Sequence, residues 1–122
     1  MARLEQGAQA MLFGAAEPES LRGPQFTHGW ADELAKWPYA EMAWDNLMMG
    51  LRLGANPRVL VTTTPRPVPL VRRLVGQAGV ALTRGGTRDN RAHLAPGFLA
   101  AMERDYGGSA LGRQELNGEL ID

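Results

Sequence analysis

Hydrophobic and polar positions along the chain follow two kinds of pattern, which together predict a mixture of helices and strands. Between Trp37 and Leu51 the large apolar residues recur at near-helical spacing, which predicts a helix over 41–52 with Gly54 as its C-cap. We interpret this Trp- and Met-rich stripe as core packing rather than as a ligand-binding face. Similar spacing, bounded by glycine and proline, predicts the other helical segments, which are 34–37, 70–75, 98–106 after Pro96, and the start of 110–121.

Short apolar or β-branched runs between turn residues predict the strands. The strand expected at 58–61 begins with Arg58 and continues with the apolar, largely β-branched run Val59-Leu60-Val61. The run that leads into Asp32 is more polar, because Thr27-His28-Gly29 interrupts it. Two further strands are expected at 9–15 and 80–83. Strands that alternate with helices in this way predict an α/β fold.

Two adjacent acids follow the strand that ends near residue 32, at the edge of a parallel sheet where ligands bind. The Asp32 carboxylate is a hard oxygen ligand suited to Mg²⁺, and Glu33 is placed to polarise an attacking water. The next expected strand ends in three hydroxyl side chains, Thr62, Thr63 and Thr64. Acids at one strand end and hydroxyls at the next are typical of an ATP-driven motor domain, so we expect the two groups to lie side by side.

Basic residues supply two further candidates. Arg22 precedes the step Gly23-Pro24, which is typical of a tight loop in which glycine takes a positive φ. Its guanidinium could bind a phosphate through its charged fork, or it could bond carbonyl groups of the loop. Seven arginines and a single acid lie between Arg58 and Arg91, and this segment could face DNA or phosphate, or form a solvated face.

Composition excludes several classes of site. The 122 residues are 44% hydrophobic and 21% charged, as in an ordinary globular domain, and 13 basic residues balance 13 acidic ones, so no global basic field indicates nucleic acid. Cysteine is absent, which excludes disulfides and thiolate sites, and His28 and His93 have no ligand-spaced partners for zinc. The hydroxyl residues lack the histidine partner of a hydrolytic triad. No apolar run is long enough to span a membrane.

A phosphate-binding loop of the form G-x-x-x-x-G-K-[ST] does not occur in the sequence. The single lysine, Lys36, follows Asp32 by four positions and therefore lies on the wrong element. The loop Gly85-Gly86-Thr87 is rich in glycine and has arginines nearby, but it lacks the required spacing. It is the less favoured candidate for a phosphate site.

Seven segments, spread in order over nearly the whole chain, carry a family resemblance. They resemble the large terminase subunit of tailed phages, and most closely the terminases of gene transfer agents and related prophages. The segments are EPESLRGPQF at 17–26, WADELAKW at 30–37, LRLG at 51–54, TTTPRP at 62–67, TRDN at 87–90, LAPGFL at 94–99 and LGRQELNGE at 111–119.

The resemblance implies an additional-strand, RecA-like P-loop NTPase sheet flanked by helices. It implies ATP and Mg²⁺ as cofactors and the pumping of double-stranded DNA into procapsids as the activity. The implied partners are double-stranded DNA, the portal protein, the small terminase subunit and neighbouring motor subunits in a homo-oligomeric ring, without a membrane. The implied location is the cytoplasm of a bacterial host, at the procapsid portal.

The resemblance also implies roles for the candidate residues. Asp32 would be the metal-supporting Walker B acid, and Glu33 would be the catalytic glutamate. Thr62–Thr64 would be the coupling motif that senses the γ-phosphate. Arg22 lies ten positions before Asp32 (32 − 22), where related motors present an arginine to the ATP of a neighbouring subunit.

We expect residues 1–122 to form one partial terminase ATPase domain with Walker B, the coupling motif and the C-terminal helical part. The Walker A strand, loop and helix would precede Met1, and the nuclease domain would follow Asp122. We therefore do not expect this chain to hydrolyse ATP alone, and we expect an exposed apolar sheet edge. The alternatives are a non-catalytic remnant or assembly module with the same fold, and a different α/β nucleotide hydrolase.

Overall fold

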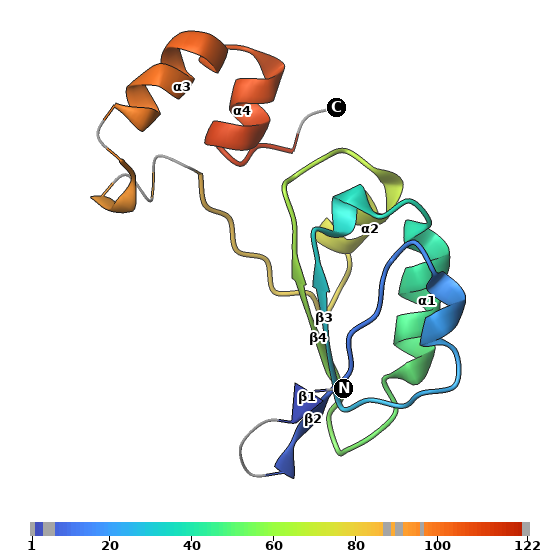
Figure 1. Cartoon of the computed structure of the whole chain (residues 1–122). Helices are drawn as coiled ribbons and strands as arrows, with labels where there is room; N and C mark the ends of the chain where they lie inside the picture. The colour runs from blue at the N-terminus through green and yellow to red at the C-terminus, as the bar shows by residue number, and fades with distance from the viewer. Residues whose placement is uncertain (1, 4–6, 87–88, 90–91, 96, 121–122) are drawn as a thin grey trace. The chain divides into compact units, whose positions relative to one another are not determined.

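The computed structural model describes all residues except 1, 4–6, 87–88, 90–91, 96 and 121–122 (Figure 1). The chain divides into two compact units, the first made of residues 1–32 and 36–61 and the second of residues 33–35 and 62–122. The strands are β1 (Ala2–Arg3), β2 (Gln9–Ala10), β3 (His28–Asp32) and β4 (Arg58–Thr62). The helices are the 3₁₀ helices η2 (Pro18–Leu21) and η3 (Leu34–Lys36) and the α-helices α1 (Ala40–Gly50), α2 (Pro69–Val75), α3 (Phe98–Tyr106) and α4 (Ala110–Leu116).

A small parallel sheet, β3 beside β4, organises the first unit (Figure 1). Helix α1 connects the two strands, as a crossover between parallel strands requires. Before β3 begins, Phe26 already forms a parallel bridge with Leu51, and the Arg58 amide, at the start of β4, donates to the Thr27 carbonyl over 3.1 Å. A separate antiparallel pair is formed by β1 and β2.

The core of the first unit lies between this sheet and α1. Ala31 is fully buried, and a Cβ on Gly29 would lie 3.2 Å from Leu47, so the alternate residues of β3 face the helix. Trp44 and Leu47 are buried on α1, which confirms core packing for these two members of the Trp- and Met-rich stripe. Its other members, Trp37, Met48 and Leu51, are half-buried. The short helix η2 also packs against α1 (Figure 1).

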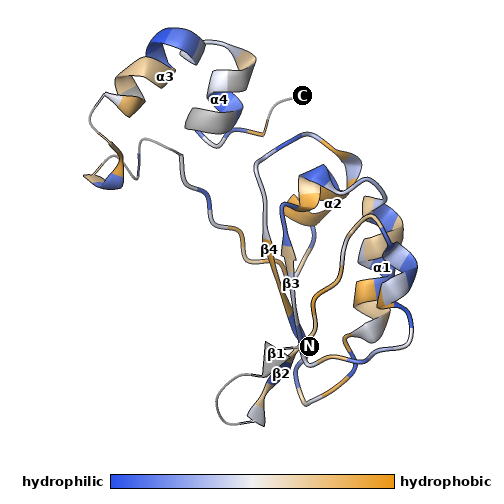
Figure 2. Ribbon diagram, viewed as in Figure 1, coloured by the Kyte–Doolittle hydropathy of each residue, from blue (hydrophilic) through white to orange (hydrophobic). Residues whose placement is uncertain are grey.

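The opposite face of the β3–β4 sheet carries exposed apolar side chains. Trp30 is 67% exposed and Leu60 is 59% exposed. Both alternate with residues that face α1, because Gly29 and Val59 approach each other on the helix side. Figure 2 shows the hydrophobic colour that runs along β4. Trp30 and Leu60 are therefore exposed together on the face of the β3–β4 sheet that is turned away from α1.

The second unit contains the helices α2, α3 and α4. Leu34 is fully buried, and on α2 the apolar side chains of Leu70, Val71 and Leu74 are buried. Helices α3 and α4 contact each other. Ser109 caps α4, because its Oγ accepts a hydrogen bond of 2.9 Å from the Gly112 amide.

The helices predicted from periodicity at 41–52, 70–75 and 98–106 are confirmed to within two residues at each end. The predicted strand at 80–83 is wrong: the segment forms no strand and pairs with no strand among the described residues, and Val80 and Leu82 are exposed. Of the strand expected at 9–15, only Gln9–Ala10 forms. Pro96 lies outside the described residues. Within the described ranges, no helix has the length and apolar composition that crossing a membrane requires.

Candidate functional site

The turn that follows β3 holds the two adjacent acids. Asp32 is the last residue of the strand, and Glu33 has a φ of 51°. Among the residues that the structure describes, Glu33 is the one non-glycine residue with a positive φ. The left-handed region costs an L-residue about 1–2 kcal/mol, so contacts around this turn must hold Glu33 there. The Oε2 atom of Glu33 is shielded from solvent.

Hydrogen bonds on either side of Glu33 hold this turn in place. The Trp37 indole Nε1 donates to the Asp32 carbonyl over 2.9 Å. Within the second unit, the Ala35 amide donates to Thr63 Oγ1 over 2.9 Å, and this hydroxyl donates in turn to the Thr64 carbonyl over 3.0 Å. The Thr63 hydroxyl is therefore oriented by two partners. It joins the residues just after Glu33 to the loop just after β4.

The predicted site residues lie at the ends of two neighbouring strands and in the turns that follow them. Asp32 ends β3, and Thr62 ends β4, the neighbour of β3 in the sheet. The segment that contains Glu33 is hydrogen-bonded to Thr63, as described above. The assignment of these side chains to one nucleotide site stays a prediction.

The fit of a magnesium ion depends on the oxygen donors that the chain supplies. In the part of the chain that the structure describes, no three or more His, Cys, Asp or Glu side chains gather as a metal site. Mg²⁺ usually keeps several waters and is bound through one or two carboxylates together with substrate phosphates. The exposed Asp32 carboxylate at the end of β3 therefore fits a Mg²⁺ ion that arrives with a nucleotide.

Arg22 lies directly after η2, at the start of the predicted tight loop. Gly23 has a φ of 101°, which confirms the positive φ expected from the sequence. The Arg22 Nη1 atom lies 3.2 Å from Glu19 Oε2, and the two side chains are 66% and 65% exposed. Arg22 thus bonds a carboxylate rather than a loop carbonyl. An exposed pair of this kind contributes about 1 kcal/mol or less, so Arg22 can exchange this partner for another anion.

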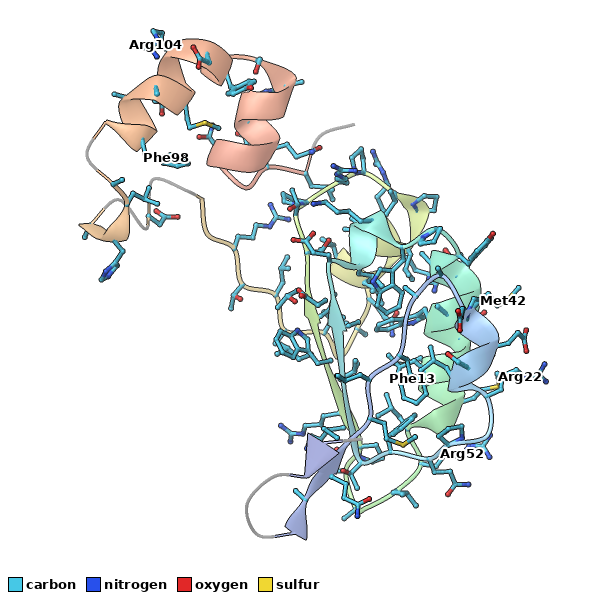
Figure 3. The ribbon with its side chains drawn as sticks, viewed as in Figure 1. Phe13, Arg22, Met42, Arg52, Phe98 and Arg104 are labelled. Carbon is cyan, nitrogen blue, oxygen red and sulfur yellow. The ribbon has the colours of Figure 1, made fainter. Side chains whose placement is uncertain are left out.

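A cavity of about 200 Å³ lies between this loop and the C-terminal end of α1. Arg22, Gln25 and the buried Asn46 line it, and Arg52 lines it from the segment that follows α1. Figure 3 shows Arg22 and Arg52 on the same side of the first unit. The sequence contained a signal for this cavity, namely Arg52 in the LRLG segment, but it gave no reason to pair Arg52 with Arg22.

Two candidates remain, the glycine-rich loop at 85–87 and the arginine-rich segment from Arg58 to Arg91. The Gly86 amide donates to Asp89 Oδ2 over 2.6 Å, so this loop already holds a carboxylate where a phosphate would have to bind. Thr87 lies outside the described residues. In the arginine-rich segment Arg88 and Arg91 lie outside the described residues, and the exposed arginines are Arg58, Arg66, Arg72, Arg73 and Arg84.

Comparison with protein families gives a match over residues 1–122 to the family described as "Terminase large subunit, T4likevirus-type, N-terminal". The match spans the whole chain. No curated protein matches the chain significantly, and no solved structure does.

Proposed function

Because this chain belongs to the terminase large subunit family of the T4-like type, in its N-terminal region, we propose that it serves the ATP-driven packaging of double-stranded DNA into procapsids. This region is part of the phage DNA-packaging ATPase and implies a P-loop fold. The mixed α/β structure with its small parallel sheet agrees with that fold. The observation that carries the proposal is the family match over the entire chain.

Within that ATPase, residues 1–122 form the part that follows the phosphate loop, with Asp32 as the Walker B acid and Glu33 as the catalytic glutamate. The family's cofactors are ATP and Mg²⁺, and the ion supplies charge neutralisation on the phosphates when it is bound. Asp32 would hold the ion. Glu33 would orient the attacking water and accept its proton.

Thr62–Thr64 would couple hydrolysis to movement. The Thr63 hydroxyl supports this role, because it bonds the amide of Ala35, two residues after Glu33. A displacement of the loop after β4 would therefore pull on the backbone next to the catalytic acid. Since the Thr63 hydroxyl joins this loop to the backbone just after Glu33, the loop and the acid turn would move together.

Arg22 would act on the ATP of a neighbouring subunit in a ring. Its position supports this role, because the crossover from β3 through α1 to β4 has two ends. Asp32 lies where β3 ends, whereas Arg22 lines a cavity with Gly50 and Arg52, where α1 ends. Helix α1 starts after the carboxyl end of β3 and ends before the amino end of β4, so these positions are at opposite ends of the crossover (Figure 1).

The further assignments are finer than the family match. We propose gene transfer agent or prophage terminases as the nearest type. The portal protein and the small terminase subunit are the proposed partners, and the cytoplasm of a bacterial host is the proposed location. Since no G-x-x-x-x-G-K-[ST] loop occurs in these 122 residues, ATP hydrolysis would require that loop from another segment.

ATP hydrolysis by the 122-residue chain, alone and mixed with a polypeptide that carries the G-x-x-x-x-G-K-[ST] loop of a related terminase, tests the proposal. We expect hydrolysis only in the mixture, with a loss of about 10²–10⁴-fold in the Glu33→Gln variant because the general base is removed. Glu17→Gln, at an exposed turn, is the matched control and should keep full activity. Absence of hydrolysis from the mixture would favour the non-catalytic assembly module instead.

A further inference from the structure

We propose that the cavity at the C-terminal end of α1 is a binding site for a phosphate group, held between the guanidinium groups of Arg22 and Arg52. This inference rests on the proposed function only for the source of the phosphate, which would be a nucleotide. It adds Arg52, which the family resemblance leaves without a role, as a residue that binds the ligand.

The walls of the cavity are fixed by contacts that do not involve the arginine side chains. The Phe26 amide donates to the Gly50 carbonyl over 2.7 Å, and the Leu53 amide donates to the Phe26 carbonyl over 3.1 Å. The buried Asn46 side chain donates to the Pro18 carbonyl over 2.9 Å and thereby ties η2 to α1. The backbones that carry the two arginines are therefore set before a ligand binds, which reduces the entropy lost on binding.

At the cavity, the backbone segments around Gly50 and Pro24 approach each other as closely as glycine allows. A Cβ at Gly50 would lie 2.9 Å from the Pro24 carbonyl oxygen and 3.1 Å from the Phe26 ring. The Phe26 ring packs edge-on against Phe13, with ring centroids 5.7 Å apart. The loop that follows Arg22 is thus held directly against the helix end that precedes Arg52.

The charges around the cavity favour an anion. None of the described residues that line it is acidic. Arg52 is exposed and forms no hydrogen bond or ion pair through its side chain with the described part of the chain. Among the described residues, Arg22 pairs with Glu19, and both side chains of that pair are about two-thirds exposed. A doubly charged phosphate between two guanidinium groups would displace this carboxylate, because each guanidinium can form bidentate bonds with it.

The helix end works against an anion, but weakly. The C-terminus of an α-helix carries a negative partial charge of roughly half an elementary charge. Here the Gly50 carbonyl accepts from Phe26, and the Leu47 and Met48 carbonyls accept from the Leu51 amide. The last carbonyls are therefore largely satisfied. Two full positive charges outweigh the remaining dipole.

The size of the cavity limits what it can take. Its volume of about 200 Å³ lies below the roughly 300–1,000 Å³ of pockets that enclose drug-sized ligands. It suits a phosphate or a diphosphate group rather than a whole nucleotide. Gly23 and Gln25 also line the cavity, and their amides donate to no group in the described part of the chain.

Titration of the 122-residue chain with pyrophosphate, followed by the NMR signals of the arginine Nε–H groups and by calorimetry, tests the proposal. We expect the Arg22 and Arg52 signals to shift with one common affinity. Arg52→Gln and Arg22→Gln should each weaken binding by about tenfold, since one charge-assisted contact is lost. Glu19→Gln should tighten binding, because it removes the competing carboxylate.

Arg58→Gln is the matched control, since Arg58 is an exposed arginine of the same unit that does not line the cavity. Equal weakening in Arg58→Gln and Arg52→Gln would overturn the proposal, and so would shifts of all arginine signals alike. ATP and a double-stranded DNA oligonucleotide form two further arms. Competition of ATP with pyrophosphate supports the nucleotide as source, whereas competition by DNA alone contradicts it.

The same variants separate this inference from the proposed function. Glu33→Gln should leave pyrophosphate binding unchanged, because Glu33 does not line the cavity. Binding of pyrophosphate without ATP hydrolysis in the complemented mixture would sink the motor function but leave the phosphate site. Normal ATP hydrolysis in the mixture without pyrophosphate binding would overturn the phosphate site but leave the motor function.

Discussion

The two ends of the crossover from β3 through α1 to β4 carry opposite charges and differ in the contacts that hold them. At the carboxyl end of β3, the acid turn is held by single hydrogen bonds and keeps Glu33 at a φ of 51°. At the C-terminal end of α1, hydrogen bonds of Phe26 and Asn46 also hold the arginine-lined cavity, but here close backbone packing at Gly50 is added to them. Isolated hydrogen bonds can be made and broken one at a time, whereas closely packed backbone segments can separate only together. The acid end is therefore suited to movement, and the arginine end to a fixed position.

Gly50→Ala gives the largest effect expected from this comparison. The added Cβ would lie 2.9 Å from a backbone oxygen, so the loop or the helix end must shift. We expect the free energy of unfolding to fall by about 1–3 kcal/mol, as for other overpacked sites, measured by urea denaturation. Gly14→Ala is the control, since nothing lies within 4 Å of a Cβ there. Equal stability of both variants would show that the arginine end is not rigidly packed.

Thr63→Ala tests the bonds of the acid end. The substitution removes the acceptor of the Ala35 amide, so we expect a loss of about 1 kcal/mol in the free energy of unfolding and faster hydrogen exchange at that amide. Thr63→Ser keeps the hydroxyl and should retain the protection. Similar exchange in both variants would indicate that the hydroxyl does not hold the acid turn.

Glu33→Gly has the smallest expected effect, and unlike the other two substitutions it should raise the free energy of unfolding. Glycine adopts a positive φ without the penalty of a Cβ, so we expect a gain of about 1 kcal/mol or less. Glu33→Ala keeps the Cβ and should not gain, which makes it the control in urea denaturation. The glycine variant should still lose ATP hydrolysis in the complemented mixture. A glycine variant no more stable than the alanine variant would show that the turn stores no strain.

Periodicity allowed the helices to be predicted from the sequence, because apolar residues at helical spacing leave a regular signal. The strand predicted at 80–83 failed for the converse reason: a short apolar run becomes a strand only with a partner to bond, and none of the described strands pairs with this one. The prediction of Gly54 as the C-cap of the helix at 41–52 was wrong. Helix α1 ends at Gly50, because the carbonyl of Gly50 and the next residue, Leu51, pair with Phe26 instead.

The chemistry of the candidate site could be predicted in kind but not in arrangement. Adjacent acids and a run of threonines identify themselves by residue type. The contact of Thr63 with Ala35 joins positions 28 apart in the sequence and depends on how two loops fold. The cavity depends in the same way on the close approach of two segments at Gly50. Neither contact leaves a local pattern in the sequence.

The exposed Trp30 on the open face of β3 gives the protein an optical reporter. Indole emission moves to shorter wavelength when water is excluded from the ring, and two-thirds of this side chain is in water. In a Trp37→Phe, Trp44→Phe background the emission would come from Trp30 alone. Any further strand, helix or subunit that docks on the sheet would then be visible as a blue shift. Assembly of a larger motor around this chain can thus be followed without an added label.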